Sequence, residues 1–134
     1  MSAANVYANT GQGTTVAKYS VKMEGIRYKR GGDTPHEGFD CSGLVKYVFD
    51  KKVGTDLPRT SAELAKLPAK KLQLPALKKG DILFFKTRGR IDHVGIYVGN
   101  KKFVHAAGRS GGVKVASLKE RYWKSVFVFG KRVR

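Results

Sequence analysis

The chain has 134 residues, 41% of them hydrophobic, and its 27 Lys and Arg against 10 Asp and Glu give a formal net charge of +17. This length fits one domain with a hydrophobic core, and the apolar fraction excludes a disordered chain. No segment reaches the roughly 18–20 consecutive apolar residues that a membrane-spanning helix needs. The excess of positive charge predicts attraction to polyanions, and this attraction weakens as salt rises.

The first 13 residues, MSAANVYANTGQG, are small and polar, and we expect them to form a flexible N-terminal tail. They lack the basic start and the apolar run of a secretory signal peptide. Three interpretations stay open: the protein is cytosolic, it leaves the cell by another route, or a leader has been removed. Residues 14–134 are expected to form a single domain.

Helical spacing of apolar residues predicts helices in the first half of the chain. Residues 14–23 predict a short helix, and the loop 27–38 follows with two adjacent glycines and a proline. The segment CSGLVKYVF has apolar residues at positions i, i+3, i+4, i+7 and i+8 counted from Cys41, and Asp40 stands where an N-cap would be. A third, short helix is predicted at residues 59–67.

Short segments rich in β-branched and aromatic residues, separated by Gly, Asn and Ser, follow residue 80. They predict an antiparallel sheet of about five strands. The strands are expected at residues 81–87, 92–99, 102–108, 112–117 and 126–133, with one turn of helix at 118–124. Helices in the first half and strands in the second half indicate an α+β fold.

Cys41 is the only cysteine, so the chain has no internal disulfide. A thiol in the first turn of a helix lies near free backbone N–H groups, which favour a thiolate and could form an oxyanion hole. The charge of Asp40 opposes the thiolate, less so if its carboxylate caps the helix. Cys41 is therefore a candidate nucleophile, and the alternative is a small buried hydrophobic residue.

His93 and His105 lie on neighbouring predicted strands and could assist the thiol. A two-residue loop, Asn100-Lys101, would place them on opposite faces of the sheet. A three-residue loop, residues 99–101, would place them on one face, with Gly95 leaving room for the His105 ring. Catalysis requires the three-residue loop. His93 would then act as the base and His105 would orient it, whereas in the alternative both are ordinary residues of the sheet.

Four segments resemble the NlpC/P60 cysteine peptidases, which cut peptidoglycan stem peptides: YKRGG…GFDCSGLVKYVF, LPRTSAEL, LKKGDILFF and DHVGIYVGNKKFVHA. They span roughly residues 26–112. The resemblance implies a papain-like core, with the helices packed on the antiparallel sheet. It also implies Cys41 as nucleophile, His93 as base and His105 as the third residue of a triad. His36, in the preceding loop, is expected to be a surface residue without a catalytic role.

The resemblance also implies roles for residues around the nucleophile. The hydroxyl of Tyr28 is expected to point toward the cysteine and to serve in oxyanion or substrate binding. Asp40 and Ser42 are expected to help hold the free amine of the substrate, and a helix cap is the alternative for either residue. Arg59 and Ser61 match a recurring segment near the cleft, without a role assigned to them.

The cysteine precedes the histidines, which favours wall peptidases over permuted relatives that include lipid acyltransferases. The resemblance implies an endopeptidase domain at residues 14–134 that needs no metal and no cofactor. It implies cleavage of peptidoglycan after γ-D-glutamate, next to a diamino acid such as meso-diaminopimelate, outside the cytoplasm. The basic surface is expected to hold the enzyme on anionic wall or envelope polymers, and nucleic acid is not the expected partner.

Two alternatives stay open. In one, the same chemistry serves a secreted antibacterial effector, with an immunity or inhibitor protein as a partner. In the other, the chain is a non-catalytic basic module that binds nucleic acid or another polyanion and retains an inactive papain-like site.

Overall fold

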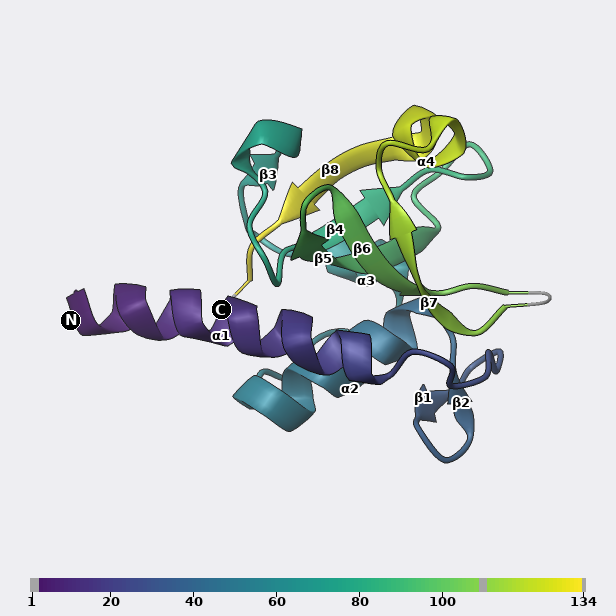
Figure 1. Cartoon of the computed structure of the whole chain (residues 1–134), viewed down its shortest axis with the longest axis horizontal. Coiled ribbons are helices and arrows are strands. Elements are labelled where there is room, and N and C mark those ends of the chain that lie inside the picture. Colours follow the sequence, from purple (N-terminus) through teal and green to yellow (C-terminus); the bar gives the residue numbers. More distant parts are fainter. Residues whose placement is uncertain (1–2, 109–110, 134) are drawn as a thin grey trace.

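The computed structural model describes residues 3–108 and 111–133, with side chains described from residue 11 onward. Figure 1 shows the arrangement of its helices and strands. In chain order the elements are α1 (Ala3–Lys22), β1 (Asp33–Thr34), β2 (Gly38–Phe39), α2 (Cys41–Val53), α3 (Ser61–Ala65), β3 (Lys71–Leu72), the 3₁₀ helix η1 (Leu74–Ala76), β4 (Ile82–Phe85), β5 (His93–Gly99), β6 (Lys102–Ala106), β7 (Val113–Ser117), α4 (Arg121–Val126) and β8 (Phe127–Lys131).

Helix α1 corrects the prediction for the N-terminus, because it begins at Ala3 and covers most of the segment expected to be a tail. The sequence placed the helix start later because apolar residues recur at helical spacing only from Val16 onward, and because two glycines lower helix propensity. The side chain of Val16 is fully buried. Within the described residues, no helix combines the length and the apolar character needed to cross a membrane.

The strands β3 to β8 form one antiparallel sheet in the order β3-β8-β4-β5-β6-β7. The five predicted strands are present as β4 to β8, so the α+β class and the antiparallel sheet are confirmed. The sixth strand, β3, has only two residues and pairs with β8. A strand of two residues shows no alternation in the sequence, which is why it was not predicted.

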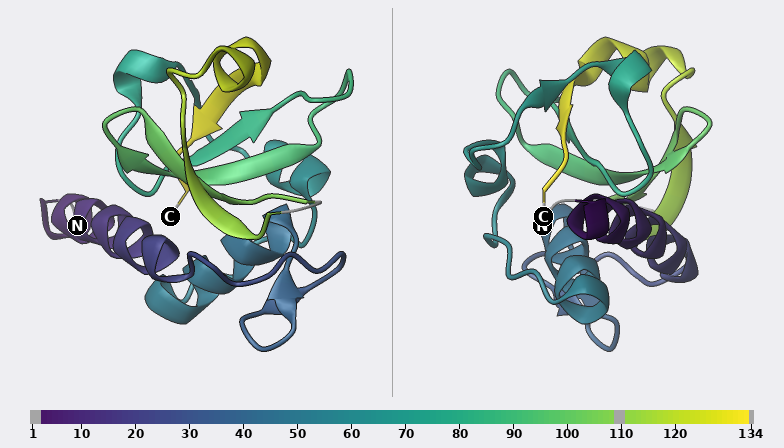
Figure 2. Two further views of the ribbon diagram at one scale, coloured as in Figure 1. Left: turned by 45° about the vertical axis from the view of Figure 1, so that its right-hand side comes forward. Right: turned by 90° about the vertical axis from the view of Figure 1, so that its left-hand side faces the viewer.

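Both faces of the sheet are covered. In Figures 1 and 2, α1 and α2 lie on one side of the sheet and α4 lies on the other. One apolar cluster joins α1 and α2 to Ile82 and Phe84 of β4, and a second joins Leu83 and Phe85 of the same strand to Trp123 of α4. Because β4 is buried on both faces, its sequence is a continuous apolar run and not an alternating one.

The loop between β5 and β6 has two residues, Asn100-Lys101, and the predicted three-residue loop is wrong. Gly99 pairs directly with Lys102 across the turn. The φ angles of Asn100 and Lys101 are 54° and 61°. Two consecutive residues with positive φ are typical of a type I′ turn, whose twist matches that of the strands it joins.

A β-bulge nevertheless brings the two histidines of this hairpin to one face. The next pair along the hairpin is Tyr97–Phe103, so Val98 is an extra residue on the β5 side. One extra residue reverses the face of every side chain beyond it. His93 and His105 therefore share a face, as the sequence required for catalysis, although the extra residue lies in the strand and not in the loop.

Two glycines allow α1 to approach the segment that leads into β4. A Cβ atom on Gly13 would overlap the carbonyl oxygen of Lys79, and a Cβ atom on Gly80 would overlap the backbone of Gly13. A Cβ atom on Gly11 of the same helix would meet nothing within 4 Å. The packing of α1 on the domain therefore depends on Gly13 and not on Gly11.

We expect Gly13→Ala to lower the free energy of unfolding by about 1–3 kcal/mol, because the added methyl group displaces α1. Gly11→Ala is the matched control and should be neutral or stabilising by up to about 1 kcal/mol, because alanine has the higher helix propensity. Urea denaturation of the two variants measures the difference. Equal effects on stability would show that α1 does not pack as described.

Candidate active site

Cys41 is the first residue of α2, as predicted. Asp40 is the N-cap of this helix: its backbone is extended, and its Oδ1 atom accepts a hydrogen bond of 2.7 Å from the backbone N–H of Gly43. The helix-cap interpretation of Asp40 is thus confirmed. A Cβ atom on Gly43 would overlap the carbonyl oxygen of Gly32, so a glycine is needed for the close approach of the preceding loop. The thiol is fixed at the point where the helix begins.

An open pocket of about 500 Å³ contains the thiol. Three segments line it: Tyr28, Arg30 and Gly31 from the loop before β1, Asp40, Cys41 and Ser42 from the start of α2, and Arg59, Thr60 and Ser61 from the start of α3. The structure thus brings four of the predicted site residues to one pocket. His93 and His105 are not among the lining residues, and both pack against Trp123 of α4.

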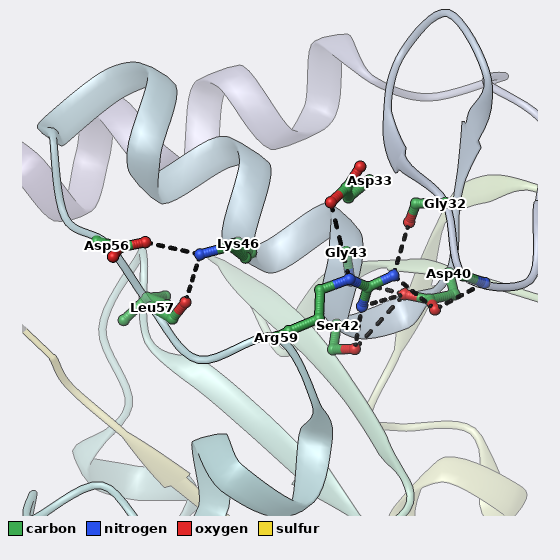
Figure 3. A network of polar contacts seen from close by, with 10 residues as sticks. Gly32, Asp33, Asp40, Ser42, Gly43, Lys46, Asp56, Leu57 and Arg59 are labelled. Atoms are coloured by element: carbon green, nitrogen blue, oxygen red, sulfur yellow. Dashed lines mark hydrogen bonds and ion pairs between the residues drawn. The ribbon is translucent and has the colours of Figure 1, made fainter.

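Arg59 connects the three segments around the pocket (Figure 3). Its Nη1 and Nη2 atoms donate to the two carboxylate oxygens of Asp40, at 3.0 and 2.9 Å. Nη1 also donates to Oγ of Ser42 at 3.0 Å, and Nη2 donates to the carbonyl oxygen of Gly32 at 3.2 Å. The hydrogen bond with Asp40 raises the pKa of Arg59. Sequence reasoning noted Arg59 only as part of a segment and gave it no role.

The carboxylate of Asp40 has little capacity left for another donor. Besides the guanidinium of Arg59, it accepts from the backbone N–H groups of Gly43 at 2.7 Å and Gly31 at 3.1 Å. A carboxylate offers about four lone-pair sites. A substrate amine at Asp40 would therefore have to displace one of these donors. Ser42 is buried beside it, and its hydroxyl oxygen already accepts from Arg59.

The sulfur of Cys41 lies against the start of β5. Burial raises the pKa of the Cys41 thiol, a hydrogen bond from the backbone of Val94 lowers it, and the charge of Asp40 raises it again. Because burial has the largest effect, the thiol is protonated at neutral pH. Val94 is the residue after His93 in β5, so this hydrogen bond places the sulfur one residue from His93 along the strand.

His93 and His105 form a hydrogen-bonded pair, with 2.9 Å between Nε2 of His93 and Nδ1 of His105. Burial lowers the pKa of His93 to about 4, against a smaller opposite effect of Asp92. Burial also lowers the pKa of His105 to about 3, with further lowering by His93 and Lys114. Both rings are therefore neutral at pH 7, and one donates to the other. This bond uses Nε2 of His93 and leaves its Nδ1 atom for another partner.

Trp123 of α4 covers both histidines. Its ring stacks on His93 at 5.7 Å and 24°, and meets His105 edge-on at 4.8 Å and 76°. Phe85 and Phe103 complete the aromatic cluster around the pair. This cover shields the rings from solvent and accounts for the effect of burial on both pKa values. Sequence reasoning missed Trp123, although its being the only tryptophan was a signal.

Tyr28 lines the same pocket as the thiol, although twelve residues separate it from Cys41 in the sequence. The residues between them fold into the small β1–β2 hairpin, and the backbone of Tyr28 bridges to Phe39. Burial raises the pKa of Tyr28, the charge of Asp40 and that of Cys41 in its thiolate form raise it further, and the positive charges of Arg30 and Arg88 lower it. The hydroxyl is therefore within electrostatic reach of Cys41.

A model of the NlpC/P60 family matches residues 25–132. The chain is 40% identical over 130 residues to murein DD-endopeptidase MepH of Escherichia coli (strain K12), covering 94% of this chain and 48% of that protein. It is 44% identical over 112 residues to gamma-DL-glutamyl hydrolase of Bacillus subtilis (strain 168), covering 82% of this chain and 27% of that protein. The chain thus spans about half of the first relative and less of the second.

The structure is also similar to the crystal structure of the NlpC/p60 domain of the peptidoglycan hydrolase SagA. The TM-score is 0.78 at 30% sequence identity, and the match covers 90% of this chain and 98% of that one. The prediction of an NlpC/P60 fold is thereby confirmed.

We expect Trp123→Ala to raise the pKa of His93 from about 4 toward its ordinary value of about 6.5, because water would reach the exposed ring. NMR titration of the histidine side chains measures this change. Tyr122→Ala is the control: the neighbouring ring is 54% exposed and should leave the titration unchanged. Trp123→Phe should retain most of the effect. An unchanged His93 titration in Trp123→Ala would contradict the shielding.

Proposed function

We propose that this chain, which belongs to the NlpC/P60 family, is a cysteine peptidase that hydrolyses peptide bonds of peptidoglycan. The single observation that supports this most is the position of the Cys41 thiol, at the start of a capped helix and hydrogen-bonded to the residue after His93. Nucleophilic catalysis needs a thiol, a base and a group that orients the base. Cys41, His93 and His105 are proposed to fill these roles.

In the proposed reaction, Nδ1 of His93 takes the proton of Cys41 while the sulfur forms a bond to the carbonyl carbon. The carbon–nitrogen bond then breaks, and the same proton passes to the leaving amine. Water hydrolyses the resulting thioester and returns the site to its starting state. His105 holds His93 in the tautomer that leaves Nδ1 free to accept the proton. The lowered pKa of His93 keeps the ring neutral at pH 7, which is the form that accepts a proton, and also makes it a weaker base than an ordinary histidine.

The negative charge that develops on the carbonyl oxygen needs donors. We propose the backbone N–H of Cys41, at the free start of α2, and the hydroxyl of Tyr28 for this role. Asp40 and Ser42 line the same pocket as the sulfur. Because Arg59 already occupies the Asp40 carboxylate, its contribution to binding a substrate amine would require a rearrangement of the Arg59 contact.

The bond that we propose first lies between γ-D-glutamate and a diamino acid such as meso-diaminopimelate. The similarity to a protein named gamma-DL-glutamyl hydrolase supports this candidate. A second candidate is a bond between two D-configured centres, and it is supported by the similarity to a protein named murein DD-endopeptidase. The two bonds lie at different positions in a cross-linked peptide, so the products distinguish them.

We further propose that the domain, with α1 packed on it, acts as one catalytic unit outside the cytoplasm. The net charge of +17 would attract the domain to anionic wall or envelope polymers, and more weakly as ionic strength rises. The same chemistry could act on the wall of the producing cell. In an antibacterial effector it would act on the wall of another cell, and an immunity protein would protect the cells that carry it. A non-catalytic polyanion-binding module is the competing proposal.

Digestion of purified muropeptides tests the proposed activity and the bond together. We expect wild-type protein to convert them into new fragments, identified by mass spectrometry, and Cys41→Ala to give none, because the nucleophile is lost. Uncross-linked tripeptide and tetrapeptide stems should be cut if the bond follows γ-D-glutamate, whereas these stems should stay intact and cross-linked dimers should be cut if the bond joins two D-centres. Absence of products from every muropeptide would favour the polyanion-binding module.

The three histidines provide a graded test of the proposed roles. His93→Ala should lower kcat/KM by at least about 100-fold, because a general base typically contributes a factor of 10²–10⁴. His105→Ala should lower it less, because an orienting group is more replaceable than the base. His36→Ala is the matched control and should leave kcat/KM unchanged, because this ring is exposed in the loop between β1 and β2. A larger loss with His105→Ala than with His93→Ala would reverse the assignment.

A further inference from the structure

The pocket around Cys41 contains one positive charge that no acidic side chain neutralises. Of its two arginines, Arg59 forms a bidentate ion pair with Asp40, at 2.9 Å between Nη2 and Oδ2. Among the side chains that the structure describes, no carboxylate lies within 4.0 Å of the guanidinium of Arg30. Arg30 therefore gives the pocket a net positive charge.

Neither neighbouring acid is free to neutralise Arg30. The carboxylate of Asp40 already accepts from Arg59 and from two backbone N–H groups. The carboxylate of Asp33 lies on the other side of the guanidinium of Arg59, with Oδ2 at 3.8 Å from Nε. An anionic ligand would thus meet no competing acid at Arg30.

The backbone of Arg30 is held in place before any ligand binds, and its side chain is exposed to solvent. Arg30 and Gly31 are the central residues of a turn closed by a hydrogen bond of 2.8 Å from the Gly32 N–H to the Lys29 carbonyl oxygen. Gly31 has a φ angle of +76°, a conformation that favours glycine, and its N–H donates to Asp40 at 3.1 Å. The turn is thereby tied to the cap of the helix that carries Cys41.

Arg30 belongs to the same pocket as the thiol. It lines the pocket together with Tyr28 and Cys41. Its positive charge also acts on the hydroxyl of Tyr28, where it partly offsets the effect of burial on the pKa of that group. A substrate with its carbonyl carbon at the sulfur would place a neighbouring group near Arg30.

We propose that Arg30 is a specificity-determining residue that binds a free carboxylate of the substrate next to the scissile bond. A guanidinium matches a carboxylate in shape, charge and hydrogen-bond geometry. The inference rests on the proposed function, because it names the substrate class of the same pocket. A peptide linked through the γ-carboxyl of glutamate keeps its α-carboxyl group free, so the proposed substrate supplies such a group. The site then prefers stem peptides with a free carboxylate over peptides with a carboxamide there.

Two synthetic peptides that differ only in this group, α-carboxylate or α-carboxamide on the γ-linked D-glutamyl residue, test the proposal. We expect wild type to cleave the acid with about three- to tenfold higher kcat/KM, mainly through a lower KM, which is typical of a partly exposed ion pair. Arg30→Gln should lose this preference by slowing cleavage of the acid alone. Arg30→Glu should prefer the carboxamide, and Arg30→Lys should retain part of the preference for the acid.

Lys29→Gln is the matched control, because Lys29 is an exposed cation in the same turn and does not line the pocket. It should leave the preference intact. Equal losses on both peptides in Arg30→Gln, or a preference that survives in Arg30→Glu, would overturn the assignment of Arg30 while leaving the proposed peptidase activity in place. Failure of wild type to cleave either peptide, and any muropeptide, would overturn the proposed function itself and the inference with it.

Discussion

The ion pair between Arg59 and Asp40 is the interaction on which the candidate site depends. The two side chains are only 30% and 19% exposed, and the contact is bidentate, so it is stronger than an ordinary surface salt bridge. The same carboxylate caps α2 and holds the turn at Gly31. One acidic group therefore fixes the helix that presents Cys41, the loop before it and the segment that precedes α3. Loss of the pair would remove the contact that joins the segment before α3 to the other two.

The second constraint is the dry aromatic cover of the histidines. Burial under Trp123 lowers the pKa values of His93 and His105, and burial also raises that of Cys41. A resting thiolate–imidazolium pair would require the opposite directions. The thiol and both imidazoles are therefore neutral at pH 7, so in the proposed reaction the proton moves only as the sulfur attacks. Charge separation then coincides with the moment when oxyanion donors can stabilise it.

Local features of this site were readable from the sequence, and features that depend on distant segments were not. The helix that begins at Cys41 and its Asp40 cap follow from spacing and residue type within a dozen positions. The contact of Trp123 with His93 joins segments with no shared local pattern, so only the fold reveals it. The β5–β6 hairpin lies between these cases. The alternation of side chains along the strands showed that one extra residue was needed to bring both histidines to one face. A longer turn and a bulge at Val98 each supply that residue, and sequence patterns do not distinguish them.

The distribution of charge in the pocket follows from the use of Asp40 as a structural group. An unpaired carboxylate beside the nucleophile would raise the pKa of the thiol further and would repel an anionic substrate. Arg59 neutralises the charge of Asp40 in a bidentate ion pair and also connects the helix to the segment before α3, so one contact has a mechanical and an electrostatic consequence. Arg30 is then the charge that a ligand meets, and its sign is that of the whole chain, whose net charge is +17. For a substrate embedded in an anionic polymer, long-range attraction and the local contact at Arg30 act in the same direction, so the approach of the substrate and its orientation at the sulfur are favoured together.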